Sequence, residues 1–195
     1  ILEKLTELAI FPASHYVTSD EERKNALKEI ENDLTKQISK FEKDNKLLEA
    51  QRIKQRTMFD LEMLGELGVC SGIENYSRYF DGRKPGEAPY TLIDFFPDDF
   101  LMVVDESHIA IPQIRGQYEG DKSRKSTLVD YGFRLPAALD NRPLKFDEWR
   151  NKVNKTILVS ATPGKWENEN SEIFIEQVIR PTGLLDPNID VRPTK

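Results

Sequence analysis

The stretch "FLMVVDESHIAIPQ", residues 100–113, decides the fold. An apolar run, 100–104, leads directly into Asp105 and Glu106, and a second run, "TILVS" at 156–160, leads into "ATPG". Short continuous apolar runs are typical of strands covered on both faces, as in parallel α/β sheets. The sequence therefore predicts an α/β fold in which two buried parallel strands each end in polar residues.

The segments around these runs carry weaker signals. Residues 115–125 are basic and contain glycine, which predicts a loop, and a helix is expected from about Lys125 to Tyr131. The C-terminal "SEIFIEQVIRPTG", 171–183, is a strand candidate. Residues 7–17, "ELAIFPASHYV", mix β-branched residues with a proline and predict an extended segment broken by a turn.

Residues 18–68 predict a pair of helices. Ser19 and Glu22 have the spacing of a capping box, and apolar residues recur at helical spacing from Leu27 to Phe41. A break at 43–46, "KDNK", separates this helix from a second one that ends near Gly68. Residues 72–91 are rich in glycine and proline, which predicts a loop with a short helix around Tyr76.

The composition excludes several classes of protein. The chain has 34 acidic and 28 basic residues, a net charge of −6, and no apolar run near the roughly 20 residues that cross a bilayer. A single cysteine, Cys70, allows no internal disulfide and suits a reducing cytoplasm. His15 and His108 are too few and too isolated for a metal site. We therefore expect a cytoplasmic protein without a membrane segment, and a chain that begins at Ile1 reads as part of a longer one.

Asp105 and Glu106 lie where an open α/β sheet places its ligand crevice, at the carboxyl end of a strand. One carboxylate there can hold Mg²⁺ bound to nucleotide phosphates, and a second can orient or deprotonate the attacking water. The alternative is structural, because two acids before a helix also favour its N-terminal dipole. Ser160 and Thr162 could hydrogen-bond the acidic loop, or could merely cap the turn before Pro163.

Together, "VVDESH" and "VSATPG" resemble motifs II and III of superfamily 2 helicases. The longer string from "GVCSGIENYSRYFDGRKPGEAPYTLIDFFPDDF" to "VDYGFRLPAALDNRPLKF" resembles the UvrB family, the helicase-like subunit of bacterial excinuclease ABC, and the likeness runs along the whole chain. This resemblance implies a partial RecA-like parallel sheet of the P-loop NTPase type, plus a mainly helical subdomain. It also implies that Asp105 binds magnesium, that Glu106 is catalytic, and that Ser160 and Thr162 link nucleotide to DNA.

The resemblance also assigns the segments. Residues 1–17 correspond to the end of the domain that docks UvrA, and 18–90 to the helical subdomain. Residues 91–163 correspond to the C-terminal half of the first helicase domain, 164–190 to a return into the helical subdomain, and 191–195 to the lead-in to the second helicase domain. UvrB-like proteins use ATP and Mg²⁺ to verify damaged DNA and present it to UvrC for incision, so DNA, UvrA and UvrC are the implied partners.

One element of an ATP site is absent from these 195 residues. No G-x-x-x-x-G-K-[ST] run occurs, since "TPGK" at 162–165 lacks the first glycine and the final Ser or Thr. That loop supplies the backbone cradle and the lysine that hold the phosphates. We therefore expect the chain by itself to be inactive as an ATPase and to bind neither ATP nor Mg²⁺.

DNA contacts remain an expectation, because single strands are bound by cationic side chains and stacking aromatic rings. The residues expected to face DNA are Tyr16, Arg56, Glu74, Gln113, Arg115 and Arg134. For each arginine the alternative is a solvated charge or an ordinary ion pair. For the chain as a whole, the alternatives to an enzyme fragment are a DNA- or protein-binding module without catalysis and the UvrB-like region of a transcription-repair coupling factor. The intact "DESH" argues against the latter.

Overall fold

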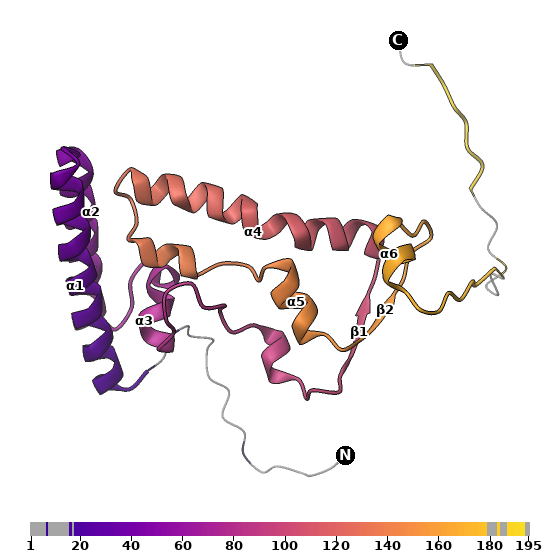
Figure 1. Ribbon diagram of the computed structural model, residues 1–195, viewed down its shortest axis with the longest axis horizontal. Coiled ribbons are helices and arrows are strands. Elements are labelled where there is room, and N and C mark those ends of the chain that lie inside the picture. The colour runs from indigo at the N-terminus through magenta and orange to yellow at the C-terminus, as the bar shows by residue number, and fades with distance from the viewer. Residues whose placement is uncertain (1–6, 8–15, 17, 179–182, 184–186, 194–195) are drawn as a thin grey trace.

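The computed structural model describes residues 7, 16, 18–178, 183 and 187–193. A helical part and a two-stranded parallel sheet lie at opposite ends of the molecule, and one long helix runs from the sheet to the helical part (Figure 1). Within the described ranges, no helix combines the length and the apolar character that a membrane span requires. The expected combination of an α/β part and a mainly helical part is confirmed.

The helical part is built on an antiparallel hairpin of α1 (Asp20–Lys43) and α2 (Leu47–Glu66). The predicted capping box forms, since Glu22 N donates to the Ser19 hydroxyl at 3.3 Å and the Glu22 carboxylate accepts from Ser19 N at 3.0 Å. The apolar stripes of both helices enter one core with the short elements η1 (Ile73–Tyr76) and α3 (Ser77–Asp81). Both the helical pair and the short helix near Tyr76 are therefore confirmed.

Arg78 fixes this hairpin to the next part of the chain. Its guanidinium donates to Asp33 on α1 at 3.0 Å and to Asp140, the last residue of η3 (Pro136–Asp140), at 2.6 Å. Arg78 is 9% exposed and Asp140 is 7% exposed, whereas the side chain of Asp33 is 31% exposed. A buried arginine needs such partners because an unpaired charge in the interior costs several kcal/mol.

The sheet pairs β1 (Leu101–Val104) with β2 (Lys155–Leu158) in parallel, in a register that sets Val103 beside Ile157. The two predicted strands and their parallel pairing are confirmed. The prediction that both faces are covered is wrong for this chain. Val104 is buried, whereas Leu101 is 55% exposed and Val103 is 56% exposed, because α4, α5 and α6 cover one face only.

The helix α4 (Ser107–Asp130) replaces the loop expected at 115–125 and contains most of the helix expected near its end. The loop prediction rested on Gly116 and Gly120. It was wrong because a glycine in an exposed helix costs only about 1 kcal/mol relative to alanine. Ion pairs one turn apart offset part of that cost: Asp121 pairs with Arg124 at 3.0 Å and with Lys125 at 2.8 Å.

The C-terminal end of α4 docks on the hairpin through Gly132. This glycine has φ +71, and a Cβ there would lie 2.4 Å from the Glu49 carbonyl oxygen on α2. Beside it, Arg52 donates to the Tyr131 carbonyl at 2.6 Å and covers the Phe133 ring at 4.2 Å. Only glycine permits this close approach of the two backbones.

A second, smaller core lies under the sheet and contains Val104, Ile111, Leu144 and Trp149. It is closed by α5 (Phe146–Lys152), α6 (Lys165–Asn170) and the 3-10 turn η2 (Leu92–Phe95). Residues 172–178 form neither helix nor strand, so the strand expected at 171–183 is wrong for its described part, and 179–182 lie outside the described residues. Most of the extended segment expected at 7–17, and most of the assigned segment 1–17, also lie outside them.

Candidate functional site at the strand ends

The two motif-bearing segments remain hydrogen-bonded beyond the ends of the strands. Val159 N donates to the Val104 carbonyl at 2.9 Å, and Ser107 N donates to the Val159 carbonyl at 3.0 Å. Each bond carries the parallel ladder one step past β1 and β2. Asp105 and Glu106 therefore emerge from the same sheet edge as Ser160, as parallel strands with short turns require.

Glu106 occupies a backbone conformation that few side chains adopt. Its φ and ψ are 45° and 49°, in the left-handed region, at the position that caps α4. Such a conformation costs a non-glycine residue on the order of 1–3 kcal/mol and persists where the surroundings enforce it. Here the enforcing contacts are the Ser107 N–H bond to Val159 and the start of α4. The carboxylate of Glu106 is thereby held outward, with its side chain 62% exposed.

A histidine and a serine join the two segments through their side chains. The Ser160 hydroxyl lies 2.7 Å from His108 Nδ1, and Glu106 Oε2 lies 3.4 Å from the same nitrogen. Ser160 Oγ also accepts the Thr162 N–H at 3.0 Å, so its own proton can go to His108 when Nδ1 is unprotonated. The side-chain hydrogen bond of His108 thus crosses to the neighbouring segment.

Thr162 contributes to this arrangement through its backbone, and its side chain is exposed. The turn that carries it is held by Glu167, whose carboxylate accepts the Gly164 N–H at 3.2 Å. Glu167 is 4% exposed, and no pattern in the sequence pointed to it. Ser107 was missed as well: it is fully buried, and its hydroxyl has no partner within the described part of the chain.

The donor set at the strand ends suits Mg²⁺ bound to nucleotide. Mg²⁺ usually takes one or two carboxylates and completes its shell with water and phosphate oxygens. Asp105 and Glu106 provide two exposed carboxylates, and Asp105 Oδ1 accepts the Glu106 N–H at 2.9 Å, which orients it. The described residues contain no group of three acidic, histidine or cysteine side chains that would bind a metal unaided. The roles of Asp105 and Glu106 therefore remain predictions that this geometry accommodates.

Three of the residues expected to face DNA gather around Cys70, in the helical part. Burial raises the pKa of the Cys70 thiol to about 11, and the charges of Arg56, Glu74 and Arg134 all act on that thiol. Tyr16 belongs to the same region, because the charge of Glu74 acts on it too and burial raises its pKa. We call the group Tyr16, Arg56, Glu74 and Arg134 the Cys70 face.

The Arg56 guanidinium on this face is hydrogen-bonded to other residues of the helical part. It donates to Asp60 at 3.0 Å and to the Ser71 carbonyl at 2.8 Å. Asp60 is 3% exposed and also accepts the Tyr76 hydroxyl at 2.8 Å. Arg56 thus has the ion pair that was the alternative to a DNA contact, although 37% of its side chain stays exposed.

Gln113 and Arg115 lie elsewhere, as exposed residues on α4. The Arg115 guanidinium covers the Phe146 ring at 4.6 Å and lies 5.7 Å from the Trp166 ring. The six expected DNA-facing residues are therefore divided between the Cys70 face and the first half of α4. No single surface contains all of them.

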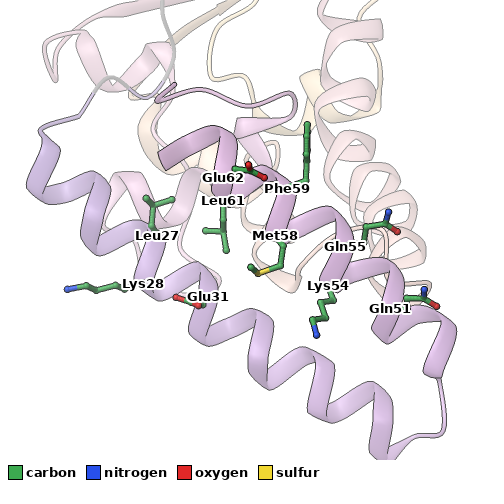
Figure 2. Close-up of a pocket in the computed structure, with 10 residues that line it drawn as sticks. All are labelled: Leu27, Lys28, Glu31, Gln51, Lys54, Gln55, Met58, Phe59, Leu61 and Glu62. Carbon is green, nitrogen blue, oxygen red and sulfur yellow. The ribbon is translucent and has the colours of Figure 1, made fainter. Parts of the chain in front are cut away.

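A groove lies remote from the strand ends, in the helical part. It lies along the hairpin, has a volume of about 960 Å³, and is lined from α1 and α2 by Leu27, Lys28, Glu31, Gln51, Lys54, Gln55, Met58, Phe59, Leu61 and Glu62 (Figure 2). Its lining mixes apolar side chains with charges of both signs. None of the expected nucleotide or DNA residues belongs to it.

Comparisons with a family model and with known proteins both relate the chain to UvrB. Residues 21–82 match the family model of the UvrB third helical domain. The chain is 61% identical over 195 residues to UvrABC system protein B of Carboxydothermus hydrogenoformans and 62% identical over 195 residues to that of Chloroflexus aggregans. It is 59% identical over 194 residues to that of Streptococcus gordonii. All of this chain is covered in each case, but it spans only 30%, 29% and 29% of these relatives.

Proposed function

The chain matches a central region of UvrB, an excinuclease ABC subunit of nucleotide excision repair, and we propose that it supplies one side of an ATP site in a DNA-repair ATPase. In this proposal Asp105 holds Mg²⁺ on the nucleotide phosphates. Glu106 orients the attacking water and accepts its proton. The phosphate-binding loop of such a site has no counterpart among the 195 residues, so the reaction requires residues supplied from outside them.

The observation that carries the proposal is the junction of the two segments at one sheet edge. In this proposal the loop of Asp105 and Glu106 faces the nucleotide, and the parallel ladder and the 2.7 Å contact of Ser160 with His108 join that loop to a hydroxyl-bearing turn. A change at Glu106 caused by hydrolysis can reach Ser160 through one imidazole ring. This arrangement supports a role for Ser160 and Thr162 in relaying the state of the nucleotide to the rest of the protein.

The proposal extends to DNA and protein partners. Damaged DNA is the proposed substrate, with the Cys70 face and the exposed residues Gln113 and Arg115 as contacts. Glu74 acts there by organising the nearby arginines, whose charges and its own all act on Cys70. UvrA and UvrC are the proposed protein partners, because the relatives belong by name to the UvrABC system. The cytoplasm is the proposed location, because a single cysteine suits a reducing compartment.

The proposal is tested in a chimera in which these 195 residues replace the matching segment of the Carboxydothermus hydrogenoformans relative. Glu106→Gln should lower the DNA-stimulated ATPase rate by at least a hundredfold, because a general base typically contributes 10² to 10⁴ in rate. Nucleotide affinity should change little. Glu119→Gln, an exposed acid farther along α4, serves as the control. Unchanged turnover in Glu106→Gln would show that Glu106 is not the residue that accepts the proton of the attacking water.

A second candidate function is a protein-binding module without catalysis. The groove along the hairpin favours it, since Met58 and Phe59 are half-exposed apolar residues within it (Figure 2). Met58→Ser separates the two functions. A module that binds through this groove should lose its partner, whereas the ATPase of the chimera should not change.

A further inference from the structure

We propose that one face of α4, together with the start of α5, binds the phosphate backbone of single-stranded nucleic acid. This α4 patch consists of Arg115, Tyr118, Lys122 and Lys145. The inference rests on the proposed function in DNA repair, and it adds a contact surface distinct from the Cys70 face.

Cations gather around a single tyrosine ring in this patch. Lys122 Nζ lies 5.6 Å from the centroid of the Tyr118 ring, and Lys145 Nζ lies 5.3 Å from it. A third cation, Arg142, lies 5.2 Å from the same centroid. Each contact is within the range of a cation–π interaction. The ring therefore holds separate positive charges close together in a protein whose net charge is −6.

Most of this charge is not neutralised locally. Arg142 forms an ion pair with Glu148, whose carboxylate accepts two hydrogen bonds of 2.7 and 2.9 Å. The Arg142 bond, and more weakly the Lys145 charge, lower the pKa of Glu148. Arg115, Lys122 and Lys145 are exposed and form no ion pair within the described residues. Three cations are thus available to an anionic ligand.

The spacing of the patch suits an extended ligand. Arg115, Tyr118 and Lys122 are separated by three and four residues, so they lie on one side of the helix. At 1.5 Å of rise per residue, Arg115 and Lys122 are roughly 10 Å apart along the axis. A single strand that follows the helix would meet a cation at each end of this stretch.

The side chains favour a nucleic acid over an acidic peptide. The Arg115 guanidinium lies over the Phe146 ring, 4.6 Å from its centroid, and forms no ion pair within the described residues, so its N–H groups are available to a phosphate. The partly exposed Tyr118 adds a hydroxyl donor among the cations. Cations interleaved with aromatic rings along a track are typical of proteins that bind single strands irrespective of sequence.

The test is fluorescence anisotropy of a labelled 20-nucleotide oligo-dT with the 195-residue chain. The double variant Lys122→Gln/Lys145→Gln should bind at least tenfold more weakly at low salt. The slope of log affinity against log salt should fall by about 1.4, since each lost phosphate contact on a single strand contributes about 0.7. The matched control is Lys28→Gln/Lys54→Gln in the hairpin groove, which should bind within twofold of the unmodified chain (Figure 2).

A charge-preserving variant, Lys122→Arg/Lys145→Arg, should restore binding. Equal affinity of the Lys122→Gln/Lys145→Gln variant and the unmodified chain would overturn the inference, as would the absence of salt-sensitive binding. Competition by polyglutamate as effective as by oligo-dT of equal charge would overturn it in favour of an acidic protein ligand. If the chimera keeps its Glu106-dependent ATPase while the patch variants bind normally, only this inference fails and the proposed function stands.

Discussion

The helical part and the sheet part differ in how completely they bury their apolar residues. In the hairpin, Ile30, Ile53 and Leu64 are fully buried, and their stripes meet in one closed core. In the sheet, Leu101 and Val103 remain more than half exposed on the face that no helix covers. The apolar side chains that stabilise the helical part are thus buried within that part. In the sheet part, one apolar face of the strands stays exposed because none of the described helices covers it.

This difference shows what each sequence pattern reports. A 3.6-residue period specifies one buried face, and the chain itself supplies the partner for that face. A continuous apolar run specifies two buried faces, and here the described residues cover one. The run at 100–104 predicted the strand correctly and overestimated its burial.

Arg78 provides the sharpest way to break the helical part. Arg78→Met removes the cation between Asp33 and Asp140, which leaves Asp140 without its ion pair and Asp33 with the exposed Lys36 alone; this should lower the free energy of unfolding by about 3–5 kcal/mol. Urea denaturation followed by circular dichroism measures the change. Lys36→Met is the control, because Lys36 also pairs with Asp33 but is 76% exposed; it should cost about 1 kcal/mol or less.

Hydrogen exchange measures the contrast between the two parts directly. Amides of 101–104 and 155–158 should exchange roughly a hundredfold faster than those around Ile30 and Ile53, a difference of about 2.7 kcal/mol in opening free energy. Two strands with one open face have little to resist opening. Equal protection in the strands and the hairpin would contradict the difference in stability between the two parts.

Gly132 tests the docking of α4 on the hairpin. Gly132→Ala places a Cβ 2.4 Å from the Glu49 carbonyl oxygen at a positive φ, and should destabilise the chain by about 1–3 kcal/mol. Gly116→Ala should have the opposite sign, a gain of about 1 kcal/mol, since nothing lies within 4 Å of its Cβ position in the helix. Thermal melts of both variants measure the pair of effects. Two changes of the same sign would contradict the docking.

The reactivity of the Cys70 thiol measures how well the helical part excludes solvent, and this test requires no substitution. Burial and then the charge of Asp60 raise its pKa to about 11. At pH 8 a thiol reagent should therefore react roughly a hundredfold more slowly than with free cysteine, whose pKa is about 8.5. Because the folded pKa is raised, the stability from this thiol is complete below about pH 8.5 and is lost as the pH rises toward 11. A folded-state titration near 8.5 would contradict the burial.

Local signals predicted the local features and the strand pairing. The Ser19 capping box and the periodic stripe located the hairpin, and two apolar runs located β1 and β2. The interactions that join distant segments gave no such signal: Asp33, Arg78 and Asp140 are far apart in sequence, and each is an ordinary charged residue there. The continuity of α4 was hidden by Gly116 and Gly120, whose cost is offset by neighbours along the helix.

At the site, sequence predicted which residues meet at the sheet edge but not how they meet. Asp105 and Ser160 follow strands, so their common edge was expected. The bond from Ser160 to His108 and the left-handed backbone of Glu106 depend on how the two turns close, which no residue pattern specifies. The division of the expected DNA contacts between two surfaces likewise depends on the docking of α4.

The central claim is that the segments carrying Asp105 and Ser160 are parallel neighbours in one sheet. Backbone nuclear Overhauser effects between β1 and β2 test it most directly. We expect cross-strand contacts in the register that pairs Val103 with Ile157, together with a contact between the amides of Ser107 and Val159. Antiparallel contacts, a shifted register, or no contact between the two segments would contradict it.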